Sequence, residues 1–291
     1  LANPLQLDRI RLFDSTLRDG LQGKRDLAIA QRVELATLLE RAGVDAIEAG
    51  YWIDGKGDLQ GLTAVAEVLS KAIVCGLAGA RQADIKQVAD AIASGRSQSG
   101  VASLPPFRIH TFSSTQLKRP DDLERVIERV EDSVRTARQF TDDVQWTAMN
   151  ATDSDLDTLV RAIESAIGAG ASTICIADTQ GNAAPDEFAR LLSDLCEQVP
   201  MPNTVLAAHC HNHEGWAVDN ALAALNAGAR QLEGTLLGVG PAGGSTDLEK
   251  LVMGIHSSSQ SWGVDVDLDF ARLEAASQMA LKHWPKIARP A

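Results

Sequence analysis

Short apolar runs rich in β-branched residues recur along the chain at intervals of roughly 30 to 40 residues, the pattern expected of buried strands. Each run is bounded by polar residues or glycine. Eight segments share this pattern: Arg9–Thr16, Val44–Gly50, Ala72–Gly79, Phe107–Ser114, Val144–Asn150, Ser172–Thr179, Thr204–His211 and Arg230–Gly238.

Amphipathic helical patterns such as "IAQRVELATLLERAG" and "LDTLVRAIESAIGAG" separate these runs, and several end in Ala-Gly directly before the next strand. A glycine there is typical of a left-handed helix stop. Eight βα units in series, with no break in composition, predict one (β/α)8 TIM barrel over residues 1–265 rather than an open sheet or two domains. The segment "FARLEAASQMALKHW" predicts one more helix, Phe270–Trp284, within a C-terminal helical extension over residues 266–291.

Such barrels build their active sites from the C-terminal ends of the strands and the loops that follow. The polar residues at these positions are therefore the candidates for chemistry. They are Asp14, Thr16, Arg18, Asp19, Glu48, His110, Thr111, Thr147, Asn150, Asp178 and Thr179, together with the histidines that follow the seventh run.

The stretch "LAAHCHNHEGWAV" holds three of the six histidines of the chain, at alternate positions. In a strand, residues i and i+2 face the same side, so His209 and His211 can both point into the barrel mouth while Cys210 points away. The pair is either a metal chelate or two hydrogen-bonded core histidines, and the barrel position favours the metal. His213 follows the strand, where the pleat no longer fixes its direction, so a loop position and a role at the substrate both stay open.

A divalent metal held by two neutral histidines still needs an anionic ligand from another strand. The segment "LFDSTLRDG" offers Asp14 and Asp19, and Asp19 lies in a tight loop better placed to reach across the mouth. Arg18 beside it could clamp a carboxylate or stabilise a developing oxyanion. The alternative is a surface turn with a local ion pair. Glu48, an acid inside an apolar strand, is the expected partner of Arg18.

Composition excludes several classes of function. With 39 acidic and 27 basic residues the net charge is −12, which disfavours nucleic acid and anionic membranes as partners. The apolar runs are too short for a membrane span, and the opening "LANPLQLDRI" lacks the pattern of a secretion signal. Three of the four cysteines, Cys75, Cys175 and Cys210, lie in strand-like runs. We therefore expect a cytoplasmic protein with buried, reduced thiols.

The segments "LFDSTLRDG", "GVDAIEAG", "RIHTF", "ATDSDLDTL", "DTQGNAAPDEF", "HCHN" and "NALAALNAGARQLEGTLLGVG" together resemble the DRE-TIM metallolyase family. The resemblance is greatest to the catalytic barrel of its 2-isopropylmalate, homocitrate and citramalate synthase branch. It implies a TIM barrel, a divalent metal ion (Mn, Mg, Zn or Co), a 2-oxo acid and an acyl-CoA as substrates, and a homodimer.

The family roles transfer to matching positions of this chain. The resemblance implies that Asp19, His209 and His211 bind the metal, that Arg18 stabilises an enolate-like oxygen, and that Glu48 supports Arg18. In the family, the histidine of "HTF" and the threonine of "DT" contact the 2-oxo acid. The expected substrate-binding residues are Gln22, His110, Thr147, Thr179 and Asn150.

Several positions depart from the family pattern. Met149 and Asn150 stand in "TAMN" where the synthases carry an acidic residue near the substrate, and His213 stands where an aspartate is usual. Ser245, in the glycine-rich segment "GVGPAGGS", aligns with an asparagine metal ligand and is the fourth expected ligand. That segment alone is also compatible with a phosphate site or with a close-packed turn.

Three functions follow from these residues. The first is a Claisen-type condensation of an acyl-CoA, such as acetyl-CoA, with a 2-oxo acid, for which His213 is the candidate proton acceptor. The second is a metal-dependent lyase or aldolase that cleaves a carbon–carbon bond, similar to hydroxymethylglutaryl-CoA lyase. The third is a non-catalytic paralogue that only binds a ligand or a protein, which the departures favour and the intact Arg18 and Asp19 disfavour.

Overall fold

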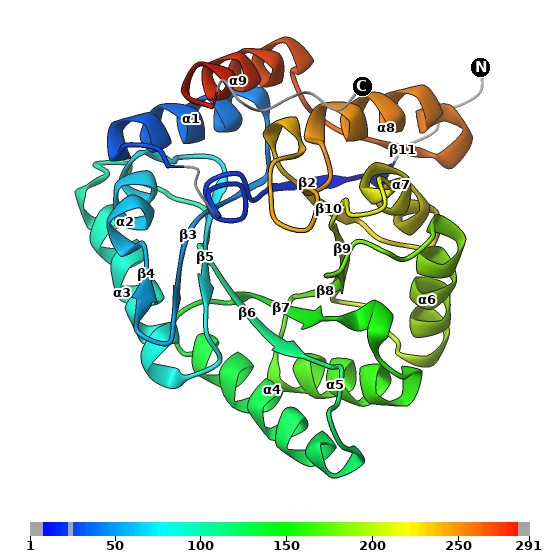
Figure 1. The fold of residues 1–291 in the computed structure, drawn as a ribbon. Coiled ribbons are helices and arrows are strands. Elements are labelled where there is room, and N and C mark those ends of the chain that lie inside the picture. The colour runs from blue at the N-terminus through cyan, green and yellow to red at the C-terminus, as the bar shows by residue number, and fades with distance from the viewer. Residues whose placement is uncertain (1–7, 23–25, 285–291) are drawn as a thin grey trace, which may run out of the picture.

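Eight parallel strands form a closed barrel in the computed structural model, which describes residues 8–22 and 26–284 (Figure 1). The strands follow one another around the ring, and β2 pairs with both β10 and β3, which closes it. The predicted (β/α)8 barrel is confirmed. Its strands are β2 (Arg11–Asp14), β3 (Ala46–Ile53), β5 (Ile73–Ala78), β6 (Arg108–Ser114), β7 (Asp143–Met149), β8 (Thr173–Asp178), β9 (Val205–Cys210) and β10 (Gln231–Gly234).

Helices surround the barrel, as Figure 1 shows. Aspartates at positions 58, 155 and 247 cap three of them by accepting bonds from backbone N–H groups. Gly43 and Gly170 end α1 and α5 in the left-handed conformation, as the Ala-Gly pattern predicts. The helices are α1 (Ile29–Ala42), α2 (Leu59–Val68), α3 (Gln82–Gln98), α4 (Leu123–Ala137), α5 (Leu156–Ala169), α6 (Pro185–Gln198), α7 (Ala217–Asn226) and α8 (Leu248–Trp262).

The predicted additional helix is present as α9 (Phe270–His283), which packs against α1 (Figure 1). It buries Leu273, Ala276 and Met279 on one face. The division of the chain into a barrel over residues 1–265 and an extension over 266–291 stays a prediction, and its outer ends, 1–7 and 285–291, lie outside the described residues.

Two strand segments differ from the sequence pattern. The first run divides at Ile10: β1 (Asp8–Arg9) pairs with β11 (Val264–Asp265) outside the barrel, and only β2 joins the ring. The second run extends past Gly50 to Ile53 and folds back on β4 (Lys56–Gly57). Asp54 and Gly55, both with positive φ, form the turn of this hairpin at the mouth of the barrel.

The apolar core lies mainly between the barrel and the helices, and a second, small cluster of Phe13, Ala46 and Cys75 lies apart from it. Large polar side chains of the barrel strands are also fully buried. Among them are Arg108, Gln145, Gln231 and Glu233, each at most 1% exposed. Barrel interiors of this fold are usually filled with Val, Ile and Leu. Here hydrogen bonds between these side chains satisfy the buried polar atoms.

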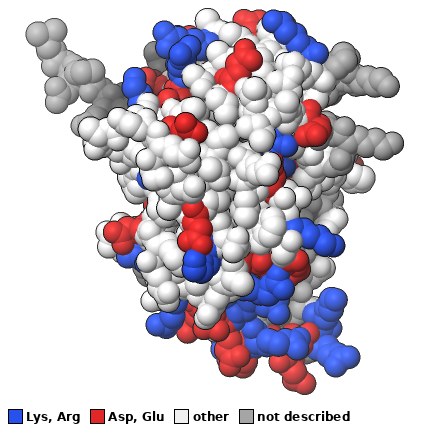
Figure 2. Space-filling model, turned by 90° about the vertical axis from the view of Figure 1, so that its left-hand side faces the viewer, with Lys and Arg blue, Asp and Glu red and all other residues white. Residues whose placement is uncertain are grey.

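On the surface shown in Figure 2, Lys and Arg side chains lie among Asp and Glu side chains, most densely at the lower end, where α4 lies. Ion pairs such as Arg125–Asp122 and Arg135–Glu131 account for this mixture. Cys75, Cys175 and Cys210 are buried free thiols, as expected, and Cys196 is exposed. Within residues 8–22 and 26–284, no helix has the length and apolar character needed to cross a membrane.

Candidate metal centre

Three predicted ligands meet in the barrel mouth. The Nε2 atoms of His209 and His211 lie 3.1 Å apart, and Asp19 Oδ2 lies 3.8 Å from the first and 3.5 Å from the second. Metal–ligand bonds of about 2.1 Å place neighbouring ligand atoms about 3.0 to 3.4 Å apart. The three side chains are therefore spaced for one small cation.

The second nitrogen of each ring faces an oxygen that can only accept a hydrogen bond. His209 Nδ1 lies 3.1 Å from Glu233 Oε2, and His211 Nδ1 lies 2.8 Å from the carbonyl oxygen of Thr179. A neutral ring that donates from Nδ1 presents a lone pair at Nε2. Two lone pairs and the Asp19 carboxylate then converge on one point, an arrangement that a divalent cation satisfies.

Charge in the cluster follows from these contacts. Burial opposes ionisation of Asp19, but Arg18 and the two histidines hold its pKa well below the usual range. Burial also opposes protonation of His209, but the hydrogen bond to Glu233 and the charge of Asp19 raise its pKa above the ordinary value. Burial opposes ionisation of Glu233 as well, but the hydrogen bond to His209, the charges of His209 and His110 and the bond from Gln145 together lower its pKa to about 2. The site attracts positive charge, whether protons or a metal ion.

The loop after β2 places Asp19 and Arg18. The carbonyl oxygen of Ser15 accepts bonds from three successive amides, those of Arg18, Asp19 and Gly20, at 2.7–3.2 Å, so the chain turns tightly around it. Gln22 donates to Asp19 Oδ1 at 3.0 Å. Gln22, predicted at the substrate, is thus in contact with a predicted metal ligand.

Arg18 connects the predicted metal ligands to the substrate-binding candidates. It donates to Asp19 Oδ1 at 2.7 Å and to Glu48 Oε2 at 2.5 Å, the pairing expected from the sequence. Glu48 Oε1 lies 2.6 Å from His110 Nδ1, and His110 Nε2 lies 2.6 Å from the hydroxyl oxygen of Thr147. Burial raises the pKa of Glu48, but Arg18 and His110 more than offset this and hold it below its usual value.

Thr179 and Asn150 lie on the rim of the same mouth. The Thr179 hydroxyl accepts the Asn150 amide N–H at 2.8 Å, while its carbonyl oxygen faces His211. Asn150 has a φ of 59°, which turns the chain after β7, and its side-chain amide donates to Ser114 at 3.2 Å. Both residues are half-buried, so their polar atoms lie within reach of a ligand in the mouth.

Ser245 also joins the cluster, with its hydroxyl donating to Asp19 Oδ2 at 3.3 Å. The segment around it is a tight turn with positive φ at Gly243 and Gly244. A Cβ on Gly243 would lie 2.6 Å from the carbonyl oxygen of Asn212, and one on Gly244 would lie 2.4 Å from that of Gly238. Of the two alternatives for "GVGPAGGS", the close-packed turn describes this geometry, and it brings Ser245 against Asp19, a predicted metal ligand.

His213 is not brought into the cluster. Its side chain is 64% exposed and lies 3.8 Å from Glu214. Its backbone, however, is fixed against Gly181, where a Cβ would lie 2.7 Å from both His213 N and His211 O. The proton-acceptor role of His213 stays a prediction.

Glu48, Cys75 and His110 form a second group whose ligand atoms lie close together among the described residues. Arg18 and His110 already occupy both oxygens of Glu48, and burial raises the pKa of the Cys75 thiol well above its ordinary value. A metal needs the thiolate. The cluster of Asp19, His209 and His211 is therefore the better metal site.

Sequence reasoning missed Glu233 and the two glutamines beside it. Gln231 and Glu233 occupy alternate positions of an otherwise apolar run, as do Gln145 and Thr147. Polar residues at period two in a buried strand indicate a polar barrel interior, so the signal was present. Their contact with His209 depends on which strands are adjacent, and β9 pairs directly with β10.

Comparison with known proteins agrees with this geometry. A family model described as HMGL-like matches residues 9–280. A 2-isopropylmalate synthase of Nitrosomonas eutropha is 38% identical over 281 residues, which cover 94% of this chain and 53% of that protein. A protein of the same name from Carboxydothermus hydrogenoformans is 40% identical over 258 residues, 86% of this chain and 49% of that protein. The chain thus spans about half the length of the curated relatives it matches.

Solved structures show the same fold. The hydroxymethylglutaryl-CoA lyase of Pseudomonas aeruginosa superposes with a TM-score of 0.75 at 19% identity, covering 98% of this chain and 96% of that chain. The carboxyl transferase domain of Rhizobium etli pyruvate carboxylase gives 0.74 at 16% identity, covering 97% and 48%. The match over almost the whole barrel, together with the arginine, aspartate and two histidines at its mouth, shows that this chain belongs to the HMGL-like, or DRE-TIM, family.

Proposed function

We propose that the barrel catalyses a divalent-metal-dependent, Claisen-type condensation of an acyl-CoA, in the first instance acetyl-CoA, with a 2-oxo acid. The convergence of Asp19, His209 and His211 next to Arg18 carries this proposal. The relatives named 2-isopropylmalate synthase support a condensation rather than another reaction. The resemblance to the DRE-TIM synthases implies that the chain would work as a homodimer.

A cation held by Asp19, His209 and His211, with Ser245 beside them, would act as a Lewis acid toward the keto and carboxylate oxygens of the 2-oxo acid. Arg18, fixed between Asp19 and Glu48, would stabilise the negative charge that develops on oxygen. A guanidinium held by two carboxylates keeps its position without reorganising during the reaction.

Substrate contacts would come from the rim residues. Because Glu48 only accepts, a His110 ring that donates from Nδ1 can accept the Thr147 hydroxyl proton at Nε2. Asn150 directly follows β7 and Thr179 directly follows β8, and Gln22 lies beside Asp19. These groups can orient the carboxylate of a 2-oxo acid. His213, in the loop after β9, is the proposed proton acceptor.

The test follows CoA release with a thiol-reactive dye, using acetyl-CoA, a divalent metal and a panel of 2-oxo acids. The proposal expects release that requires both a 2-oxo acid and the metal and that is lost in Arg18→Ala. Cleavage of hydroxyacyl substrates with a silent panel would assign a lyase instead. Metal binding without either reaction would indicate a binding paralogue and would contradict the proposal.

A further inference from the structure

The interior of the barrel beneath the metal centre holds a series of hydrogen-bonded polar side chains. Which groups can donate and which can only accept fixes the direction of each hydrogen bond in this series. Asp143 binds Arg108 through both oxygens, at 2.9 and 3.2 Å. Arg108 Nη1 donates to the side-chain oxygens of Gln145 at 3.0 Å and Gln231 at 2.8 Å. Since a guanidinium can only donate, it sets which end of each amide faces it.

The amide nitrogens of both glutamines consequently point toward Glu233. Gln145 donates to Glu233 Oε1 at 2.7 Å, and Gln231 donates to the same oxygen at 3.1 Å. Oε1 is therefore occupied by two donors, and Oε2 remains for His209 Nδ1 at 3.1 Å. Glu233 is 1% exposed, so water does not compete for either oxygen.

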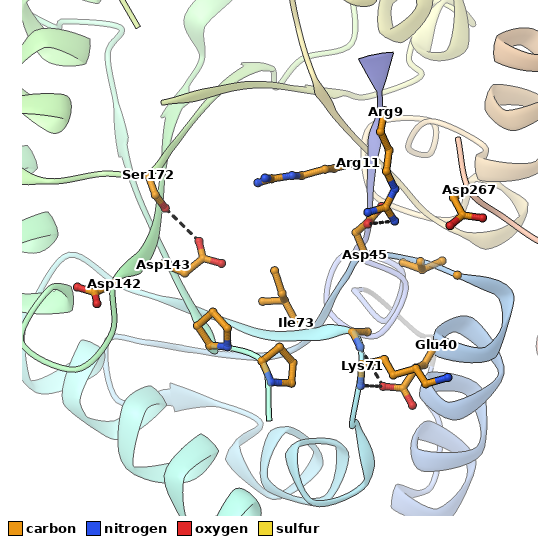
Figure 3. A pocket seen from close by; sticks show the side chains of 15 residues that line it. Arg9, Arg11, Glu40, Asp45, Lys71, Ile73, Asp142, Asp143, Ser172 and Asp267 are labelled. Atoms are coloured by element: carbon orange, nitrogen blue, oxygen red, sulfur yellow. Dashed lines mark hydrogen bonds and ion pairs between the residues drawn. The ribbon is translucent and has the colours of Figure 1, made fainter. Parts of the chain in front are cut away.

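These hydrogen-bonded side chains extend from one end of the barrel to the other. Asp143 lines an open cavity of about 640 Å³ formed by the first residues of several strands, Arg11 and Ile73 among them, so it lies at the N-terminal end. Figure 3 shows Asp143 there, hydrogen-bonded to Ser172, with Arg11 extending across the opening. The metal ligands lie at the opposite, C-terminal end. The polar interior thus connects the two ends.

We infer that Glu233 is the positioning residue that holds His209 as the Nδ1–H tautomer and so keeps the Nε2 lone pair directed at the metal. The inference rests on the metal centre of the proposed function. His211 is held by a different acceptor, the carbonyl oxygen of Thr179, so Glu233 acts on one of the two ring ligands only. Removing such an outer partner typically weakens metal binding about 10- to 100-fold.

The variant Glu233→Gln separates this role from simple packing. The two glutamine donors retain the amide oxygen at the Oε1 position, so the new NH2 group faces His209 Nδ1. That nitrogen must then accept, and the proton moves to Nε2, where it blocks the metal. We expect Mn²⁺ affinity to fall about 10- to 100-fold in isothermal titration calorimetry. In the metal-free variant at high pH, ¹⁵N chemical shifts of the ring nitrogens should report Nε2–H for His209 and unchanged Nδ1–H for His211.

The control is Glu249→Gln, the same change at a half-buried glutamate on α8 that bonds Leu237 and Ser277, and it should leave Mn²⁺ affinity unchanged. Full Mn²⁺ affinity in folded Glu233→Gln, with His209 still Nδ1–H, would overturn the inference. If this variant does not fold, the ¹⁵N shifts of His209 in the Zn²⁺-loaded wild type test the inference. Binding of Zn²⁺ through Nε2 supports it, and binding through Nδ1 contradicts it. A wild type that binds metal but releases no CoA refutes only the proposed reaction, whereas the tautomer readout concerns Glu233 alone.

Discussion

His209 Nε2 and His211 Nε2 face each other at 3.1 Å, while the Nδ1 atom of each ring lies against an oxygen that cannot donate. Two neutral imidazoles in this arrangement would repel through their lone pairs. A proton or a metal ion between them removes the repulsion, and Asp19 Oδ2 adds negative charge on the same side. The pair is therefore arranged as a chelate.

Replacing Gly181 by alanine should weaken metal binding without removing a ligand. Gly181 has a φ of 71°, and its Cβ would meet the backbone of His211 and His213 at 2.7 Å. Gly215→Ala is the matched control, since Gly215 has a φ of 85° and open space around it. Gly215→Ala should lose about 1–2 kcal/mol of stability through its positive φ alone, and Gly181→Ala should lose more because of the backbone clash. Only Gly181→Ala should lose Mn²⁺ affinity in calorimetry, and equal affinities in the two variants would contradict the expectation.

Asp14 should make the protein less stable as the pH rises from about 5 to 7. Burial is the main cause that raises the pKa of Asp14 to about 7, and bonds from Thr16 only partly offset it. Over this range the unfolded carboxyl is ionised while the folded one keeps its proton. The folded state thus binds more protons, and the free energy of unfolding falls with pH by up to about 1.4 kcal/mol per unit.

The variant Asp14→Asn has no carboxyl group to titrate at this position, and its amide can still form hydrogen bonds with Thr16. Its free energy of unfolding, measured by urea denaturation in EDTA, should rise relative to the wild type by up to about 3 kcal/mol between pH 5 and pH 7. A difference between the two proteins that stays constant over this range would show that Asp14 is ionised in the folded state.

Glu48→Gln should destabilise the protein and release Arg18. Glu48 is fully buried and is the partner of both Arg18 and His110. Breaking a buried pair by removing one charge costs about 3 kcal/mol, whereas the exposed Glu67→Gln on α2 should change stability by less than about 0.5 kcal/mol. Thermal unfolding compares the two variants. Equal melting temperatures would mean that Glu48 does not hold Arg18 in place.

His213→Ala should separate metal binding from catalysis. Because the ring is exposed and outside the ligand cluster, Mn²⁺ affinity should change by no more than about twofold. If His213 takes up the proton of the acyl-CoA, the rate of CoA release should fall about 100-fold. An unchanged rate would remove His213 from the mechanism.

The fold could be predicted from the sequence because each strand and helix carries its own periodicity. All eight predicted strand segments and the helix at Phe270 are present. The division of the first run at Ile10 could not be predicted, since β1 pairs with residues more than 250 positions away. Its apolar pattern continues through both parts, and only the long-range partner distinguishes them.

Site residues could be predicted where they lie in a strand, because the strand pleat fixes the face to which each side chain points. His209 and His211 share a face because they are two residues apart in β9, and Cys210 lies in the outer core as expected. His213 follows the strand, so its position depends on Gly181 in a loop from another unit. Glu233 touches His209 only because β10 pairs with β9 in that register. Such contacts come from the arrangement of strands rather than from any local motif.

The central claim, one divalent cation held by Asp19, His209 and His211, is tested most directly by calorimetric titration of the metal-free protein with Mn²⁺. We predict one site per chain in the wild type, and in Asp19→Ala an affinity at least about 100-fold weaker, since a direct ligand is lost. The exposed Glu214→Ala should bind like the wild type. No saturable binding in the wild type, or equal affinity in Asp19→Ala, would contradict the account.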